Sequence, residues 1–108
     1  MDTKKTYREA VKAVIGKYAK LRPSHGQIRL ESVFDEDQER YALMQVGWDQ
    51  GVRVRGNLIY VTINDDQVCI EYDGVEHGIV DDLVRLGIPR DKIVLTFLPV
   101  EEATRVRA

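Results

Sequence analysis

Acidic side chains gather at three places in this 108-residue chain, and carboxylates are the side chains best suited to metal chemistry. The three groups are Asp35/Glu36/Asp37/Glu39, Glu71/Asp73/Glu76 and Asp81/Asp82. Hard divalent cations take oxygen ligands, so these groups raise the hypothesis of a metal-dependent hydrolase or nuclease that uses Glu71, Asp73 and Glu76. A nuclease of the common carboxylate type also needs a Glu-x-Lys-like element, and no lysine follows Glu71-Tyr72-Asp73. We therefore interpret residues 35–39 as a solvated hairpin tip and Asp81/Asp82 as the polar face of a helix.

Histidine and cysteine offer little further chemistry. His25 lies in a Pro-Ser-His-Gly turn and His77 near a predicted helix start, so a two-histidine metal site has no motif behind it. Cys69 is the single cysteine, and its place inside the run Val68–Tyr72 indicates a small buried hydrophobe rather than a nucleophile. No nucleophile-elbow sequence is present. We expect a protein without catalytic residues, metal or cofactor.

Recognition chemistry is concentrated around one predicted turn. Gly47-Trp48-Asp49 precedes Arg53 and Arg55, and an aromatic ring beside guanidinium groups is a common composition for an interface. The simpler interpretation, which we favour, puts Trp48 in the core, lets Asp49 open the turn, and leaves both arginines exposed on the other face of the strand. The alternative is a partner-binding surface built from Trp48, Asp49, Arg53, Arg55, Tyr60, Asp73 and Glu76.

The element that opens the chain is an amphipathic helix. Its apolar stripe consists of Tyr7, Val11, Val14, Ile15, Tyr18 and Leu21, and Pro23 forces it to end by about Leu21. Thr6–Glu9 reads as a capping box, or Asp2/Thr3 caps the helix one turn earlier. Gly16 lies inside the helix, where it costs about 1 kcal/mol relative to alanine, so we expect it to let another backbone approach closely.

From Gln27 onward the pattern alternates with a period of two, which predicts four consecutive strands. The alternating apolar residues are Ile28 and Leu30; Ala42, Met44, Val46 and Trp48; Val52 and Val54 with Ile59, Val61 and Ile63; and Val68, Ile70 and Tyr72. Short polar connectors predict hairpins and hence an antiparallel meander. The third strand changes phase at Gly56-Asn57, which predicts a bulge or bend there.

After the strands, Asp73-Gly74-Val75-Glu76 is expected to cap a second helix that ends at Gly87 and Pro89. Residues 93–97 then return as a fifth strand or extended edge, and residues 99–108 are expected to form a loose tail. The chain is thus predicted to be a single α+β domain over residues 1–108. It has an antiparallel sheet of four to five strands in meander order, with the N-terminal helix and the second helix packed on one face.

Charge is distributed unevenly. The chain has 16 Lys/Arg and 18 Asp/Glu, a net charge of −2, whereas residues 1–22 alone carry seven basic and two acidic groups. The molecule as a whole lacks the basic field of a non-specific nucleic-acid binder, and the basic residues of the first helix do not form one row. With no apolar run long enough to cross a membrane and no signal-peptide pattern, a reducing cytoplasm is the expected compartment.

An ordered series of motifs resembles the XisI family. It comprises Gly47-Trp48-Asp49, Arg53, Gly56, Asp73-Gly74-Val75-Glu76, Gly78-Ile79-Val80, Leu86-Gly87-Ile88-Pro89 and Ile93-Val94-Leu95, with Tyr7-Arg8, Tyr18 and Tyr41 at similar places. The resemblance extends from Tyr7 to about Pro99. The chain departs from it at Tyr60, where relatives commonly have a histidine, and at Val75, where they often have a threonine.

The resemblance implies a cyanobacterial controlling factor for excision of the fdxN element, which a separate recombinase removes during heterocyst development. XisI-like proteins act beside XisH, which resembles an endonuclease-fold protein. Our leading hypothesis is therefore a non-enzymatic accessory protein that contacts an XisH-like partner and self-associates. The rivals are a direct DNA-binding accessory factor that uses the first helix, Arg53 and Arg55, and an antitoxin-like regulator of a nuclease-like partner.

Overall fold

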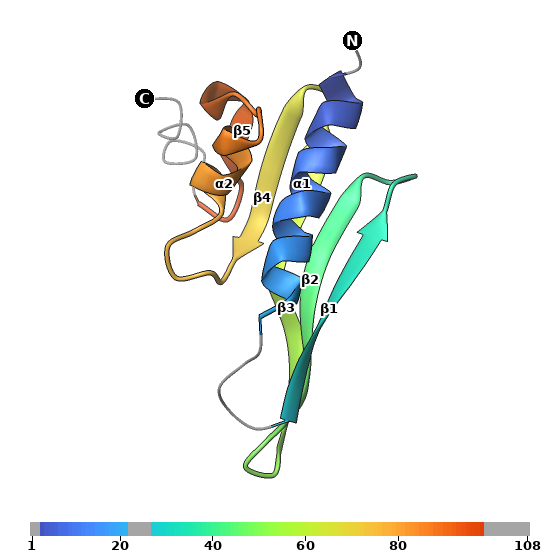
Figure 1. The fold of residues 1–108 in the computed structure, drawn as a ribbon, viewed down its shortest axis with the longest axis vertical. Helices are drawn as coiled ribbons and strands as arrows, with labels where there is room; N and C mark the ends of the chain where they lie inside the picture. The colour runs from blue at the N-terminus through green and yellow to red at the C-terminus, as the bar shows by residue number, and fades with distance from the viewer. Residues whose placement is uncertain (1–2, 22–26, 99–108) are drawn as a thin grey trace.

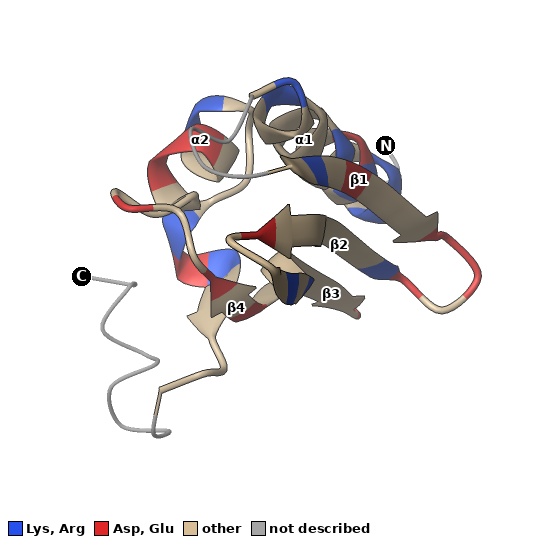
Figure 2. Cartoon of the chain, turned by 90° about the horizontal axis from the view of Figure 1, so that it is seen from below, with Lys and Arg blue, Asp and Glu red and all other residues tan. Residues whose placement is uncertain are grey.

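The chain folds into a five-stranded sheet with two helices on one side (Figures 1 and 2). The structure is a computed structural model that describes residues 3–21 and 27–98. The elements are α1 (Thr3–Ala19), β1 (Gln27–Asp35), β2 (Arg40–Asp49), β3 (Val52–Asn64), β4 (Gln67–Asp73), α2 (Val80–Arg85), the short 3-10 helix η1 (Arg90–Lys92) and β5 (Ile93–Leu95). The predicted tail, residues 99–108, lies outside the described residues.

The sheet has the strand order β1-β2-β3-β4-β5. Strands β1 to β4 form the predicted antiparallel meander. The predicted fifth strand is present, but β5 pairs parallel to β4. The segment that contains α2 and η1 crosses back along the sheet before β5 begins, and such a crossover joins parallel rather than antiparallel neighbours. The fold is therefore α+β with a mostly antiparallel sheet, as expected.

Two bulges change the phase of the sheet. Leu43 pairs with Ile59 while Met44 pairs with Asn57, so Leu58 is an extra residue in β3, next to the predicted Gly56-Asn57 position. A second register shift follows Tyr60 and leaves Glu71 as an extra residue in β4. Because a bulge moves later side chains to the other face, Tyr72 leaves the core side and is 48% exposed.

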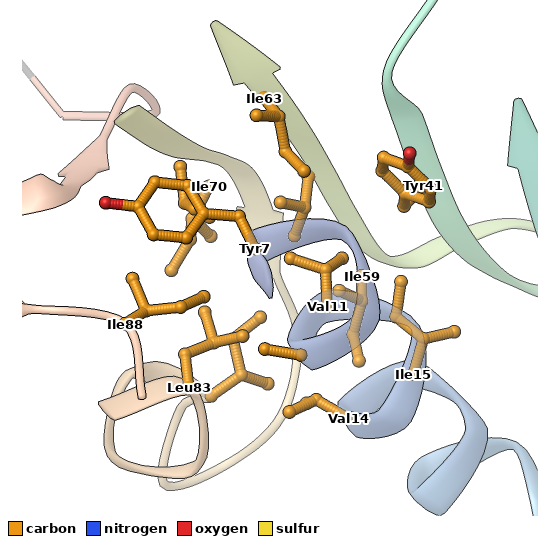
Figure 3. Close-up of a cluster of buried hydrophobic side chains, with 14 of the residues drawn as sticks. Tyr7, Val11, Val14, Ile15, Tyr41, Ile59, Ile63, Ile70, Leu83 and Ile88 are labelled. Atoms are coloured by element: carbon orange, nitrogen blue, oxygen red, sulfur yellow. The ribbon is translucent and has the colours of Figure 1, made fainter. Parts of the chain in front are cut away.

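The hydrophobic core lies between α1, α2 and the sheet (Figure 3). From α1 it receives the predicted apolar stripe except Leu21, which lies beyond the helix and is 57% exposed. From the strands it receives residues with alternate spacing. Fully buried side chains at its centre include Val11, Ile15, Ile59, Ile70 and Leu83. The amphipathic period of α1 thus explains which of its faces is buried.

The start of α1 differs from one prediction. The helix begins at Thr3, so Thr6 lies inside it and the Thr6–Glu9 capping box is wrong. Gly16 also differs from expectation: a Cβ added there would meet nothing within 4 Å, so no neighbouring backbone of this chain requires a glycine at that position.

Replacing Gly16 by alanine should stabilise the protein. The position is inside a helix and offers open space to the added methyl group. Alanine restricts the unfolded chain and has the higher helix propensity, so we expect a gain of about 0.5–1 kcal/mol in the free energy of unfolding. Urea denaturation followed by circular dichroism measures it, and an unchanged or lower midpoint would contradict the open space around Gly16.

The face assignment of β2 is the largest correction to the predicted core. Tyr41 and Leu43 are fully buried, whereas the predicted inward set is half-buried at Ala42, Met44 and Val46 and 51% exposed at Trp48. Alternation within β2 indicates the wrong side, because Ala42, Met44, Val46 and Trp48 outnumber the apolar residues of the other parity. The pairing with β3 identifies the buried side of β2. Tyr41 lies opposite Val61 and Leu43 opposite Ile59, and these partners belong to the helix-covered side.

The opposite side of the sheet carries neither helix, and we call it the open face (Figure 2). Paired residues of neighbouring strands share a face. The open face therefore includes Trp48 with Arg53, Val46 with Arg55, and Ala42 with Tyr60. No helix in the described part of the chain is long and apolar enough to cross a bilayer.

Candidate functional site

The end of the β2–β3 hairpin brings together three of the residues singled out from the sequence. Trp48 and Arg53 are cross-strand partners, and the Arg53 guanidinium carbon lies 5.5 Å from the centre of the Trp48 ring. Arg55 follows two residues later on the same face and is also exposed. We call Trp48, Arg53 and Arg55 the hairpin patch. The predicted core position of Trp48 is thus wrong, and the alternative, an exposed aromatic beside two arginines, agrees with its placement.

The two arginines of the hairpin patch have no carboxylate partner among the described residues. Many basic side chains elsewhere have carboxylate partners, as Arg29 has Glu31 and Lys92 has Asp66. A cation stacked on an indole face gains about 0.5–1 kcal/mol at an exposed site, which holds Arg53 close to the ring. The patch thus presents an apolar ring and two uncompensated positive charges.

The hairpin itself explains why these residues project. Gln50 and Gly51 both have positive φ (51° and 78°), the pattern of a type I′ turn, which matches the twist of a two-residue hairpin. Asp49 pairs with Val52 at the turn, as predicted, and lies on the opposite face from Trp48. In Figure 1 this hairpin reaches beyond the end of α1, so its tip has no helix over it.

Tyr60 lies further along the open face, on the same side as the hairpin patch. It pairs with Ala42 on one side and Tyr72 on the other, and its hydroxyl accepts a hydrogen bond of 3.0 Å from the Arg40 guanidinium. Between Tyr60 and Trp48 the half-buried side chains of Ala42, Met44 and Val46 give a continuous apolar strip. The predicted partner-binding residues Trp48, Arg53, Arg55 and Tyr60 therefore share one surface.

Asp73 and Glu76 do not belong to that surface. The Asp73 carboxylate accepts hydrogen bonds from the backbone N–H groups of Val75 (3.0 Å) and Ile79 (2.8 Å). It therefore holds the loop before α2 rather than capping the helix directly, because α2 begins only at Val80 and has six residues. Glu76 is exposed in that loop. The proposed trio of Glu71, Asp73 and Glu76 does not converge: Glu71 is hydrogen-bonded to Thr62, and the described residues contain no cluster suited to a metal ion.

A buried polar cluster joins α1 to α2, and sequence reasoning missed it. The Tyr18 hydroxyl donates a hydrogen bond of 2.6 Å to Asp82 and lies 3.0 Å from His77 Nε2. The other Asp82 oxygen pairs with Lys17 (3.2 Å) and Arg85 (3.1 Å). Asp82 is only 7% exposed, so its assignment to the polar face of the helix is wrong.

Proton affinities in this cluster follow from its contacts. Burial, reinforced by the hydrogen bond to Asp82, raises the pKa of Tyr18 to about 12. The hydrogen bond from Tyr18 lowers the pKa of Asp82, with further help from Lys17. Both shifts keep the phenol neutral and the carboxylate charged at neutral pH. The cluster is therefore a fixed connection between the helices.

A second missed cluster lies under the β1–β2 turn. Glu39, assigned from the sequence to a solvated tip, is only 8% exposed and has a left-handed backbone (φ 56°). One of its oxygens accepts hydrogen bonds from Arg8 (2.8 Å) and Tyr41 (3.1 Å), whereas the other has no partner. Burial, reinforced by Glu39, raises the pKa of Tyr41 to about 12. The cluster ties α1 to the sheet and offers no open position to a ligand, because the unpartnered oxygen is inaccessible.

A known protein family matches nearly the whole chain. The family model described as XisI protein matches residues 1–106. The chain belongs to the XisI family. A search of curated proteins found no match.

Two solved structures of XisI type resemble the whole fold. One is the crystal structure of fdxN element excision controlling factor XisI from Anabaena variabilis ATCC 29413, at 29% identity and a TM-score of 0.80, covering 94% of this chain and 98% of that one. The other is a XisI-like protein from the same organism, at 23% identity and a TM-score of 0.82, covering 94% and 93%. The second supports the fold alone. The resemblance predicted from the ordered motifs is thereby confirmed.

Proposed function

We propose that this XisI-family chain is a non-enzymatic controlling factor of DNA-element excision or a related regulatory process, acting through contact with an XisH-like protein. The name of the Anabaena relative, an excision controlling factor, supports a regulatory rather than a catalytic role. We place the protein in the cytoplasm. The observation that carries the contact hypothesis is the hairpin patch, where Trp48 is half exposed and stacks against Arg53.

The chemistry of the patch defines the partner surface that fits it. An exposed tryptophan gains most when it enters an apolar pocket, and tryptophan and arginine are the residues that most often dominate interface energies. Arg53 and Arg55 lack carboxylate partners among the described residues, so the complementary surface should supply carboxylates around that pocket. The apolar strip that leads to Tyr60 provides further area for the same contact.

Direct DNA binding has less support. A DNA contact through α1 requires its basic side chains to be available to phosphates. Three of them instead have carboxylate partners in the chain: Arg8 pairs with Glu39, Lys12 with Glu36, and Lys17 with Asp82. An antitoxin-like role, in which the chain restrains a nuclease-like partner, uses the same contact as the leading proposal.

Substitutions in the hairpin patch should weaken binding to the partner. We expect Trp48→Ala and Arg53→Glu each to weaken binding of a purified XisH-like protein at least about tenfold, because they remove the aromatic anchor and reverse a complementary charge. Isothermal titration calorimetry measures the dissociation constant. Phe97→Ala is the matched control, since Phe97 is equally exposed (49%) but follows β5, at the sheet edge opposite β1, and is not part of the hairpin patch.

Three results would count against the proposal. If the two wild-type proteins elute separately at micromolar concentration, the proposed complex does not form. If Phe97→Ala weakens binding as much as Trp48→Ala does, the hairpin patch is not the binding surface. In gel-shift assays, wild-type affinity for DNA that falls steeply with salt and is lost in Arg53→Glu would favour the DNA-binding rival. Nuclease activity of the partner, assayed with and without this chain, tests the antitoxin-like role.

A further inference from the structure

The outer edge of β1 is a long strand edge that no other described strand covers. All nine residues from Gln27 to Asp35 pair with β2 in unbroken register, so the bulges of the sheet lie elsewhere. The opposite edge of the sheet is β5, which has only three residues. β1 therefore presents a regular row of backbone N–H and C=O groups on its free side.

Few of the features that normally protect a strand edge occur in β1. Soluble proteins block such edges with proline, a bulge or charged side chains, lysine above all. The charged residues of β1 are Arg29, Glu31 and Asp35, which carry both signs. β1 has no proline and no lysine, and it exposes apolar side chains on both faces: Val33 is 53% exposed and Phe34 38%. The edge is therefore suited to receiving another strand.

The side chains of β1 are complementary to those of the same strand in a second copy. Consider two β1 strands that pair antiparallel about a two-fold axis through Ser32. Arg29 then lies opposite Asp35 of the second copy, and Leu30 lies opposite its Phe34. Leu30 and Phe34 both lie on the helix-covered side, since they pair with Gln45 and Tyr41 of β2. The axis duplicates each contact, so two ion pairs and two apolar pairs form.

The neighbouring registers are less favourable. An axis through Glu31 would place two like charges directly opposite each other, which destabilises a strand pair. An axis through Leu30 would also form ion pairs, because it places Arg29 against Glu31 of the second copy. However, it would pair Phe34 with a position beyond the start of β1, so the apolar contact is lost.

We propose that the free edge of β1 is the homodimer interface of this protein, with two β1 strands paired antiparallel about Ser32 to form one continuous ten-stranded sheet. The occupant is a second copy because the same nine residues supply both charges and both halves of the apolar contact. The hairpin patch belongs to β2 and β3, so this inference is independent of the proposed partner contact. An interface of one strand pair is small, and we expect dissociation in the micromolar range.

Charge reversal and its rescue test the interface and its register together. Sedimentation velocity on the full chain, over about 1–200 µM, should show a monomer–dimer equilibrium. Arg29→Glu should raise the dimer dissociation constant at least about tenfold, since it places two acidic groups together twice. The double variant R29E/D35R restores the pairs with their signs exchanged and should return the constant to within about threefold of wild type.

Each alternative result is informative. A wild-type chain that stays monomeric over this range, or a dimer unaffected by Arg29→Glu, would overturn the proposal. Rescue by R29E/E31R instead of R29E/D35R would overturn the Ser32 register. Arg53→Glu is the matched control: it should weaken binding of the XisH-like protein and leave the dimer unchanged. The two proposals can therefore fail separately.

Discussion

Replacing Gly47 by alanine should destabilise the protein by about 3 kcal/mol, although it adds only one methyl group. Gly47 lies in β2, opposite Ile28 of β1. An added Cβ would overlap the carbonyl oxygen of Gln27 and come within 2.7 Å of the Ile28 Cα atom. These are backbone atoms of the neighbouring strand, so no side chain can rotate away and the start of β1 has to move. Urea denaturation followed by circular dichroism measures the loss.

The same substitution at Gly16 provides the control for Gly47→Ala. Both variants add one Cβ, but Gly16 faces open space and is expected to gain stability rather than lose it. Opposite signs for the two variants would show that the loss comes from the contact with β1. A midpoint for Gly47→Ala equal to that of wild type would mean that β1 does not approach β2 at this residue.

The order of the helices, strands and turns was predictable because the sequence patterns that indicate them are local. Alternation, polar turns and a phase change each concern a few neighbouring residues, and they predicted the hairpins and the bulge beside Gly56. The face of β2 was not predictable in this way. Ala42, Met44, Val46 and Trp48 outnumber the apolar residues of the opposite parity, and only the pairing with Ile59 and Val61 across the sheet identifies the buried side.

The candidate site was predictable to a similar extent. Residue types around one turn placed Trp48, Arg53 and Arg55 near each other, because a two-residue hairpin brings both strand ends together. The grouping of Asp73 and Glu76 with them was not supported, since Asp73 is the last residue of β4 and Glu76 lies in the loop after it. The polar clusters of Asp82 and Glu39 join residues 64 and 31 positions apart, and no local pattern reports contacts over such separations.

Replacing Asp82 by asparagine should cost about 2 kcal/mol of stability at pH 7, because hydrogen bonds to a charged group contribute about 1.5–3 kcal/mol. The carboxylate accepts the Tyr18 hydroxyl at 2.6 Å on one oxygen and pairs with Lys17 and Arg85 through the other. Asparagine keeps the shape but removes the charge, and one of its two polar atoms becomes a donor that faces donors. The free energy of unfolding from urea denaturation at pH 7 measures this loss.

The pH dependence of that loss identifies its cause. The hydrogen bond from Tyr18 holds the pKa of Asp82 in the folded protein below its ordinary value of about 4. Between the lowered pKa of the folded protein and about pH 4, the unfolded chain therefore binds more protons than the folded one. The stabilisation by Asp82 is therefore complete above about pH 4 and disappears as pH falls through the folded pKa. We expect the difference between wild type and Asp82→Asn to shrink below about pH 4. Asp81→Asn is the control. Its carboxylate is exposed, and among the described residues it pairs only with exposed Arg90, so its effect should stay below about 0.5 kcal/mol at all pH values. A difference for Asp82→Asn that stays constant from pH 7 to pH 3 would show that the buried charge does not contribute, and that only the shape of the side chain matters.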